Sequence, residues 1–326
     1  MITRRSFIAA SSAGVAGTLF APSVLRAQEA LVLWGPPATP TLLLAQATED
    51  AELRKVAPGV TFQVWRNPDE MRAGVASGDM SAVILPTYSA ANFYNRGLDV
   101  RLANVLTDGL LYVVSGDESI KMVGDLKGKT VACPFRNDMP DFILQKLLAH
   151  DKLVIGTDLQ VEYTATPPEG MQLLLAGRVD AIAVPEPVAS GAIAAAKAAG
   201  ETLYRSISMR QAWETATGRK RQPSPGLAIT DKLTGRIGTE GLEVLQQSLE
   251  RAADLINKDA AAAAALASEA LKLPAPVLAE SAAHSALVAR RASTVREDLE
   301  DLFGLFAEMD ARIIGGKIPD AGLYAL

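Results

Sequence analysis

The chain has 326 residues, a formal net charge of −5 at pH 7 and a hydrophobic fraction of 49%. An acidic chain without a basic, aromatic-rich patch argues against nucleic-acid binding. The single cysteine, Cys133, excludes an internal disulfide. The two histidines, His150 and His284, have no spacing that suits a zinc site, and no motif indicates a cofactor.

The N-terminus has the pattern of an export signal. Arg4 and Arg5 stand side by side ahead of Phe7, as in the twin-arginine signals of bacterial export. The apolar segment 9–21 is too short and too interrupted to span a membrane, and residues 24–27 resemble a cleavage region. A general secretory signal with a chance arginine pair is the alternative. Either signal predicts a periplasmic protein from which residues 1–27 have been removed.

The remaining residues, about 300 in number, are more than one ordinary domain needs and suit two lobes. In chain order, the first part alternates strands and helices, with strands expected at 31–34, 60–64, 83–85 and 102–106 and helices at 41–53, from 68 onward and at 88–95. The strand 110–114 then carries the chain into a second part. There we expect strands from 130, at 159–163 and at 181–184, and helices at 138–150, 168–176 and 190–199. The basic stretch 210–222 is predicted to be a surface excursion, 226–230 a returning strand, and the rest helical.

Two stretches about a hundred residues apart repeat one pattern. Residues 77–88 and 176–187 each contain a helix end, a capping glycine, an apolar strand and a proline at the end of the strand. Near-continuous apolar strands are typical of parallel strands covered on both faces. The repeat predicts two α/β lobes of one design with a cleft between them. Two ordinary helix–strand units in one large domain are the alternative.

Three segments carry a resemblance to a known family. They are Asp-Leu-Lys-Gly-Lys at 125–129, the strand 181–187 that ends in Glu-Pro, and Gly-Gly-Lys-Ile-Pro at 315–319. Together, in this order, they resemble the solute-binding proteins of ABC importers of the nitrate, sulfonate and taurine type. That group includes binders of thiamine-pyrimidine precursors. The resemblance covers essentially the whole chain after the signal.

The resemblance implies an α/β type II periplasmic-binding fold, with two lobes, a mostly parallel sheet in each, and two hinge crossings. The elements alone indicate crossings near Asp108 and Ser224. We therefore expect residues 28–108 and 225–326 to form lobe 1 and residues 109–224 to form lobe 2. The implied function is delivery of a small organic solute to an ABC permease by a monomer without a cofactor. Presentation of the solute to a sensor is an alternative that the sequence leaves open.

A ligand of such a protein is expected at the carboxyl ends of the strands. In the first lobe, Trp34 and Thr39 follow the first strand, and Thr87 and Tyr88 follow the third. The tryptophan and tyrosine rings could supply flat walls for a ring or an alkyl chain, or could belong to the core. Asp108, at the first crossing, is a weaker candidate.

In the second lobe, the loop before the helix 138–150 is the most suggestive. It contains Phe135, Arg136, Asn137 and Asp138. Free backbone N–H groups at the start of the helix, together with Arg136, could hold a carboxylate, sulfonate or phosphonate. Asp138 is predicted either to cap the helix or to face the cleft. Glu186 stands at the corresponding strand end later in the lobe and could either accept a hydrogen bond from a ligand or tie down the hinge.

These residues support two kinds of ligand. An anionic or heteroaromatic solute would be anchored by Arg136, whereas an amine-bearing solute would be held by Asp138 and Glu186. Catalysis on the same fold would need a nucleophile, for which Cys133 is the candidate. Neither histidine falls in a strand-end loop, so the thiol lacks a base. The sequence therefore favours a binding protein over an enzyme.

Overall fold

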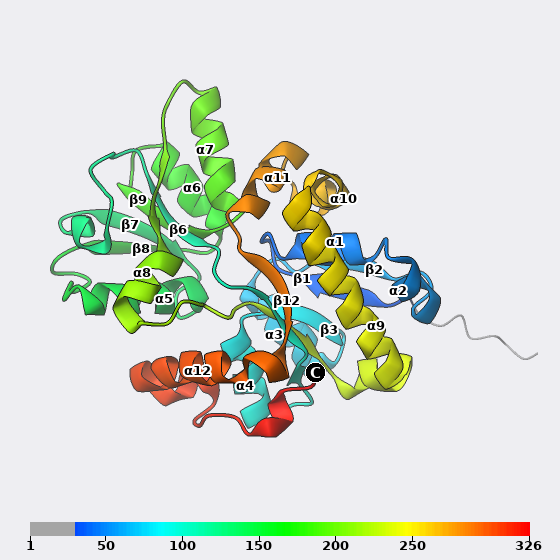
Figure 1. Cartoon of the computed structure of the whole chain (residues 1–326). Helices are drawn as coiled ribbons and strands as arrows, with labels where there is room; N and C mark the ends of the chain where they lie inside the picture. The colour runs from blue at the N-terminus through cyan, green and yellow to red at the C-terminus, as the bar shows by residue number, and fades with distance from the viewer. Residues whose placement is uncertain (1–29) are drawn as a thin grey trace, which may run out of the picture.

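The structure, a computed structural model, describes residues 30–326, so the predicted signal at 1–27 lies outside the described residues. Two five-stranded sheets stand side by side, each flanked by helices (Figure 1). The first sheet has the order β2 (Thr61–Val64), β1 (Val32–Gly35), β3 (Ala82–Leu85), β11 (Gly226–Ile229), β4 (Arg101–Leu102). The second has the order β10 (Tyr204–Ser208), β6 (Leu111–Ser115), β9 (Ala181–Pro185), β7 (Thr130–Pro134), β8 (Gln160–Thr164).

In each sheet one strand runs against the other four. β1 pairs in parallel with β2 and β3, whereas β11 pairs antiparallel with β3 and β4. Likewise β7 pairs in parallel with β8 and β9, whereas β6 pairs antiparallel with β9 and β10. This arrangement confirms the predicted α/β fold with two mostly parallel sheets and one reversed strand in each.

The chain crosses between the sheets twice. The first crossing leads from β5 (Asn104–Thr107) to β6, and the second from the end of helix α8 (Met209–Thr217) to β11. β5 also pairs antiparallel with β12 (Leu287–Arg291) in a small separate sheet. Asp108 and Ser224 lie in these two crossings, as the sequence predicted. The exact division into lobes at 28–108, 109–224 and 225–326 stays a prediction.

Helices cover both sheets. Those associated with the first sheet are α1 (Thr41–Ala47), α2 (Ala51–Val56), α3 (Pro68–Ser77), α4 (Thr87–Asn95), α9 (Asp231–Lys258), α10 (Ala261–Leu271) and α11 (Ala275–Ala283). Those associated with the second are α5 (Met139–His150), α6 (Pro167–Leu175), α7 (Val188–Ala198) and α8. Within residues 30–326 no single helix is long and apolar enough to cross a membrane; α10 and α11 have enough apolar length together but meet at 119°.

The repeated pattern is confirmed at its glycines. Gly78 ends α3 in the left-handed region with φ 77°, and Gly177 follows α6 with φ 65°. Both conformations are ones that glycine adopts without steric cost. The predicted helix 41–53 is instead two helices, because the Asp50 carboxylate accepts hydrogen bonds from N–H groups of the next turn and starts α2. Asn67 caps α3, since its side chain accepts from the Glu70 N–H.

Three elements of the second half differ from the sequence prediction. The stretch 210–222, expected as a surface excursion, contains most of α8, and its Trp213 is only 1% exposed. β10 was not predicted, and β12 falls in a region expected to be helical. These elements depend on partners distant in the chain, β6 and β5 respectively, which local sequence patterns do not reveal.

The last long helix, α12 (Arg296–Asp310), packs against helices of both halves (Figure 1). Phe306 of α12 lies 5.8 Å from the Tyr88 ring of α4 and 5.6 Å from the Phe142 ring of α5, measured between ring centroids. Trp213 of α8 lies 6.5 Å from the same ring. Edge-to-face aromatic contacts of this kind add to the free energy of area burial. This aromatic cluster joins the two halves in a continuous core.

We predict that Phe306→Ala lowers the free energy of unfolding by about 3–5 kcal/mol, because it removes a fully buried ring and leaves a cavity. Denaturant titration followed by tryptophan fluorescence measures the change. Leu255→Ala is the matched control, since Leu255 is 52% exposed and its truncation should change stability by less than about 0.5 kcal/mol. Equal effects of the two substitutions would contradict the aromatic cluster as a structural joint.

Candidate ligand-binding cavity

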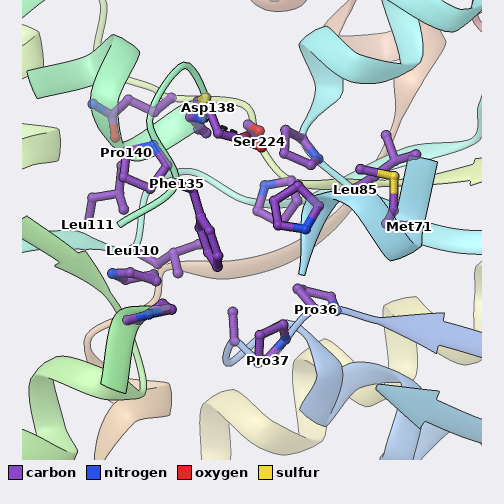
Figure 2. Close-up of a pocket in the computed structure, with 18 of the residues that line it drawn as sticks. Pro36, Pro37, Met71, Leu85, Leu110, Leu111, Phe135, Asp138, Pro140 and Ser224 are labelled. Carbon is purple, nitrogen blue, oxygen red and sulfur yellow. Dashed lines mark hydrogen bonds between the residues drawn. The ribbon is translucent and has the colours of Figure 1, made fainter. Parts of the chain in front are cut away.

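A cavity of about 90 Å³ lies between the two halves, at the carboxyl ends of their strands (Figure 2). From the first half it is lined by residues after β1, after β2 and after β3, namely Pro36, Pro37, Ala38, Trp65, Pro68, Met71, Leu85 and Pro86. The second half and the crossings contribute Gly109, Leu110, Leu111, Phe135, Asp138, Met139, Pro140, Pro167, Pro185, Gln222, Ser224 and Pro225. The site is thus where ligands bind in open α/β sheets.

The walls of the cavity are apolar. Trp65 and Phe135 supply the aromatic surfaces, and Figure 2 shows the Phe135 ring reaching into the space between Leu110 and the prolines. The Trp65 indole N–H donates to the carbonyl of Ile84 at 3.0 Å, which fixes the ring in place. Asp138 is the one charged residue among the described residues that line the cavity.

Asp138 joins the two halves through its carboxylate. The Tyr88 hydroxyl donates to Asp138 Oδ1 at 2.7 Å, and Arg72 Nη2 donates to Oδ2 at 3.0 Å. The backbone N–H of Met139 also donates to Oδ1, at 2.7 Å, so Asp138 caps α5 as predicted. The alternative prediction, that Asp138 faces the cleft, holds as well, because the residue lines the cavity.

Burial shifts the pKa values of Asp138 and Tyr88. It raises the pKa of Asp138, and the hydrogen bonds from Tyr88, Met139 and Arg72 oppose that rise. Burial and the neighbouring carboxylate both raise the pKa of Tyr88 well above its usual range. The phenol therefore remains a proton donor, and the carboxylate keeps three donors around it. We call Asp138, Tyr88 and Arg72 the interlobe latch.

Of the ten residues predicted to contact a ligand, the structure brings Phe135 and Asp138 to the cavity. Tyr88 reaches Asp138 with its hydroxyl, but its ring lies in the aromatic cluster with Phe142 and Phe306. Trp34 is half-buried and packs on the core instead of the cavity. The tryptophan that lines the cavity is Trp65, one strand further on.

The two predicted threonines hold neighbouring segments together. The Thr39 hydroxyl donates to Ser281 Oγ at 3.1 Å, and its N–H donates to the Glu186 carbonyl at 3.1 Å. The Thr87 hydroxyl donates to the Pro223 carbonyl at 2.8 Å. Both side chains are fully buried and do not line the cavity.

Arg136 and Asn137 point away from the cavity. Both are exposed, and the Arg136 guanidinium lies 5.1 Å from the centroid of the Tyr163 ring. Phe135 and Asn137 each have φ 59°, a left-handed conformation that is rare for residues other than glycine. These two bends turn the loop so that Phe135 faces inward while Arg136 faces solvent. The structure therefore does not bring the predicted anion-binding arginine to the cavity.

The other two predicted acids are paired with arginines. Glu186 is fully buried and accepts from Arg205 Nε at 2.8 Å and from the Ser190 N–H at 3.0 Å. Asp108 forms an ion pair with Arg290. Neither carboxylate lines the cavity. Among the residues the structure describes, no cluster of three or more metal-ligating side chains occurs.

Sequence reasoning missed Trp65, Leu110 and Gln222. The rule that ligands lie beyond the carboxyl ends of strands could have found Trp65, because it follows the predicted strand 60–64 directly. Leu110 and Gln222 belong to the two crossings, whose closeness depends on the assembled fold. The Gln222 N–H donates to the Asp108 carbonyl, which joins the two crossings, and the Glu186 N–H donates to the Leu110 carbonyl, which joins the end of β9 to the first crossing.

The architecture is that of the periplasmic solute-binding proteins of ABC importers. Solved structures similar to this chain include an ABC transporter from Parabacteroides distasonis, at 18% identity and a TM-score of 0.75 over 91% of this chain and 99% of that one. The periplasmic aliphatic sulphonate binding protein SsuA from Escherichia coli is 19% identical, with a TM-score of 0.70 over 91% and 92% of the two chains. The periplasmic nitrate-binding protein NrtA from Synechocystis PCC 6803 is 15% identical, with a TM-score of 0.56 over 76% and 68%. A comparison with curated proteins found no match.

The sequence itself supports the same assignment. A model of the NMT1-like family matches residues 68–268, and the chain belongs to this family. The resemblance stated from the three sequence segments is thereby confirmed.

The latch predicts a measurable coupling between the two halves. Tyr88→Phe should lower the free energy of unfolding by roughly 1–3 kcal/mol, because it leaves a buried carboxylate short of a donor. Combining it with Asp138→Asn in a double-mutant cycle should give a coupling of about 0.5–3 kcal/mol, measured by denaturant unfolding. Tyr94→Phe on the same helix is the control, since its hydroxyl bonds Asp320 at the surface. A coupling of zero would mean that the latch does not form.

The cysteine offers a second check. Cys133 is fully buried, and burial raises the pKa of its thiol well above its usual range. We predict that 5,5′-dithiobis(2-nitrobenzoic acid) does not react with the native protein and titrates one thiol after denaturation in guanidinium. Rapid reaction of the native protein would contradict this burial and would revive a nucleophilic role for Cys133.

Proposed function

We propose that this protein is an exported solute-binding protein that captures a small organic solute in the cavity between its lobes and delivers it to an ABC permease. The observation that carries the proposal is the cavity itself, which lies at the carboxyl ends of the strands of both sheets. Two structural neighbours, a sulphonate-binding and a nitrate-binding protein, support a solute-binding role. The family match supports the same class.

Closure of the two lobes would supply the affinity. A ligand favours the closed arrangement only by the extra contacts it makes there. In this structure the halves already meet through the interlobe latch and through Thr39 N–H, which donates to the Glu186 carbonyl. The two crossings are the hinges we propose, because each is a short connection that could absorb the backbone change. We propose the lobe boundaries 28–108 with 225–326, and 109–224, on the same basis.

The proposed cellular location and transport partner are those expected of an ABC-importer solute-binding protein. The paired arginines Arg4 and Arg5 support export to the periplasm by the twin-arginine route. The partner would be an inner-membrane permease that recognises the closed form of a monomeric binding protein. We propose that the protein is not an enzyme, and the buried, non-acidic thiol of Cys133 supports this.

An amine-bearing solute has less support than an uncharged one. Both carboxylates that would hold it are already paired, Asp138 with Arg72 and Glu186 with Arg205. An anion anchored by Arg136 has equally little support, because that side chain lies outside the cavity.

Ligand binding tests the proposal directly. A thermal-shift screen of the mature protein should find a compound that stabilises it, by roughly 2.7 kcal/mol at a hundred times its Kd. Mass spectrometry of freshly purified, denatured protein would detect a solute that is already bound. We expect Ala38→Phe, which fills the cavity, to abolish the shift, and the exposed Ala265→Phe to preserve it. A shift that survives Ala38→Phe would place the ligand elsewhere.

A further inference from the structure

Helix starts that face a cleft normally offer free N–H groups to an anion. Six helices directly follow a strand of the parallel part of either sheet: α1, α3, α4, α5, α6 and α7. In all six a proline occupies the cap or one of the first two positions, as Pro40, Pro68, Pro86, Pro140, Pro167 and Pro187. Because proline has no backbone N–H, each of these helices offers fewer donors than usual. A single proline at a helix start is common, whereas here all six helices that follow parallel strands have one.

Four of these six prolines, Pro68, Pro86, Pro140 and Pro167, lie in the wall of the cavity, whereas Pro40 and Pro187 do not. Of the 18 prolines in the chain, eight line it: Pro36, Pro37, Pro68, Pro86, Pro140, Pro167, Pro185 and Pro225. The rings of these eight prolines supply apolar surface at strand ends and helix starts, which would otherwise present backbone amides. The cavity wall is thus apolar and poor in donors.

Several amides that remain at these helix starts already have acceptors inside the protein. Thr87 N–H donates to Ser224 Oγ at 3.2 Å, and Met139 N–H to Asp138 Oδ1 at 2.7 Å. At α3, Glu70 N–H donates to the Asn67 side chain, and at α7, Ser190 N–H donates to Glu186. An anion in the cavity would have to break these hydrogen bonds before it could accept from the same N–H groups. Exchanging one acceptor for another contributes little to the free energy of binding.

The charged groups around the cavity also disfavour a charged ligand. Asp138 is the one charged residue among the described residues that line the cavity, and its two oxygens accept from Tyr88, Arg72 and Met139. An anion would meet a carboxylate in a buried space, where like charges repel strongly. A cation would have to displace Arg72 from the latch. Neither sign of charge finds a free partner.

We propose that the part of the solute that enters this cavity is uncharged and mainly apolar, a small ring or short alkyl segment that packs against Trp65 and Phe135. This inference rests on the proposed function, since it names the solute class for the same site. The volume of about 90 Å³ is smaller than the apolar cavity of about 150 Å³ that holds benzene, so in this arrangement of the lobes it limits that part of the solute to a small segment. Ser224 Oγ, whose hydrogen remains free to donate, can serve one acceptor on the ring.

Matched pairs of neutral and anionic compounds test the inference. Benzyl alcohol, phenol and indole form the neutral series, and benzoate, benzenesulfonate, methanesulfonate and nitrate form the anionic series, each titrated by calorimetry or thermal shift into the mature protein. We expect binding within the neutral series and at least tenfold weaker binding of the anion of matching size. Tighter binding of an anion, abolished by Ala38→Phe, would overturn the inference while leaving the proposed function intact.

Two variants sharpen the result. Phe135→Ala should weaken the neutral ligand about tenfold, because it removes an aromatic wall, and Phe135→Leu should restore part of the loss. Arg136→Ala should leave the affinity within twofold, since its side chain is exposed and outside the cavity. A loss of tenfold or more on Arg136→Ala would instead identify an anion site and contradict the inference.

Different results would contradict the solute-binding function and the inference that the solute is uncharged and apolar. If no compound of either series binds, the solute released from denatured protein decides: a charged molecule without an apolar ring or chain overturns the inference, and a neutral apolar one supports it. If no compound binds and no solute is released, the proposed function itself fails. The salt dependence of the Kd is an independent test. The Kd of an uncharged solute should not change between about 0.02 and 0.5 M sodium chloride.

Discussion

The carboxylate of Asp138 is the contact on which the arrangement of the two halves depends. It caps a helix of one half and receives hydrogen bonds from Tyr88 and Arg72 of the other. A buried carboxylate is unfavourable unless donors surround it, so the assembled state is favoured when both halves supply them. The ring of Tyr88 continues into the aromatic cluster with Phe142 and Phe306, so one side chain couples the polar contact to apolar packing.

The cavity is a consequence of the same arrangement. Because the latch occupies the charged groups at the junction, the space beside it is left with proline, leucine and aromatic walls. The neighbouring acids are neutralised in the same manner, Glu186 by Arg205 and Asp108 by Arg290. These three carboxylates therefore serve the structure of the protein, and specificity would come from shape and apolar contact.

The C-terminal helix adds a second connection between the halves. In addition to Phe306, α12 offers Asp298 and Asp301 to Arg221 and Arg219, which follow α8. Surface ion pairs of this kind contribute little individually, whereas the buried ring makes the larger contribution. A helix near the C-terminal end of the chain is thus in contact with helices and loops of both halves.

The sequence by itself determined the plan of the molecule: the two repeated helix–strand units with their capping glycines, the two crossings and the family resemblance all follow from local patterns. Local patterns suffice there because the backbone conformation at Gly78 and Gly177 is a local property, and because the apolar pattern of a strand can be read from consecutive residues. Only the tertiary structure decided which side chains reach the cavity. Arg136 turns to solvent because Phe135 and Asn137 both adopt positive φ, and Glu186 turns to Arg205 because β10 lies close to it. Trp65 replaces Trp34 as the aromatic wall for the same reason: the direction of a side chain is set by contacts between segments far apart in the chain, and their distances are fixed only when the sheets assemble.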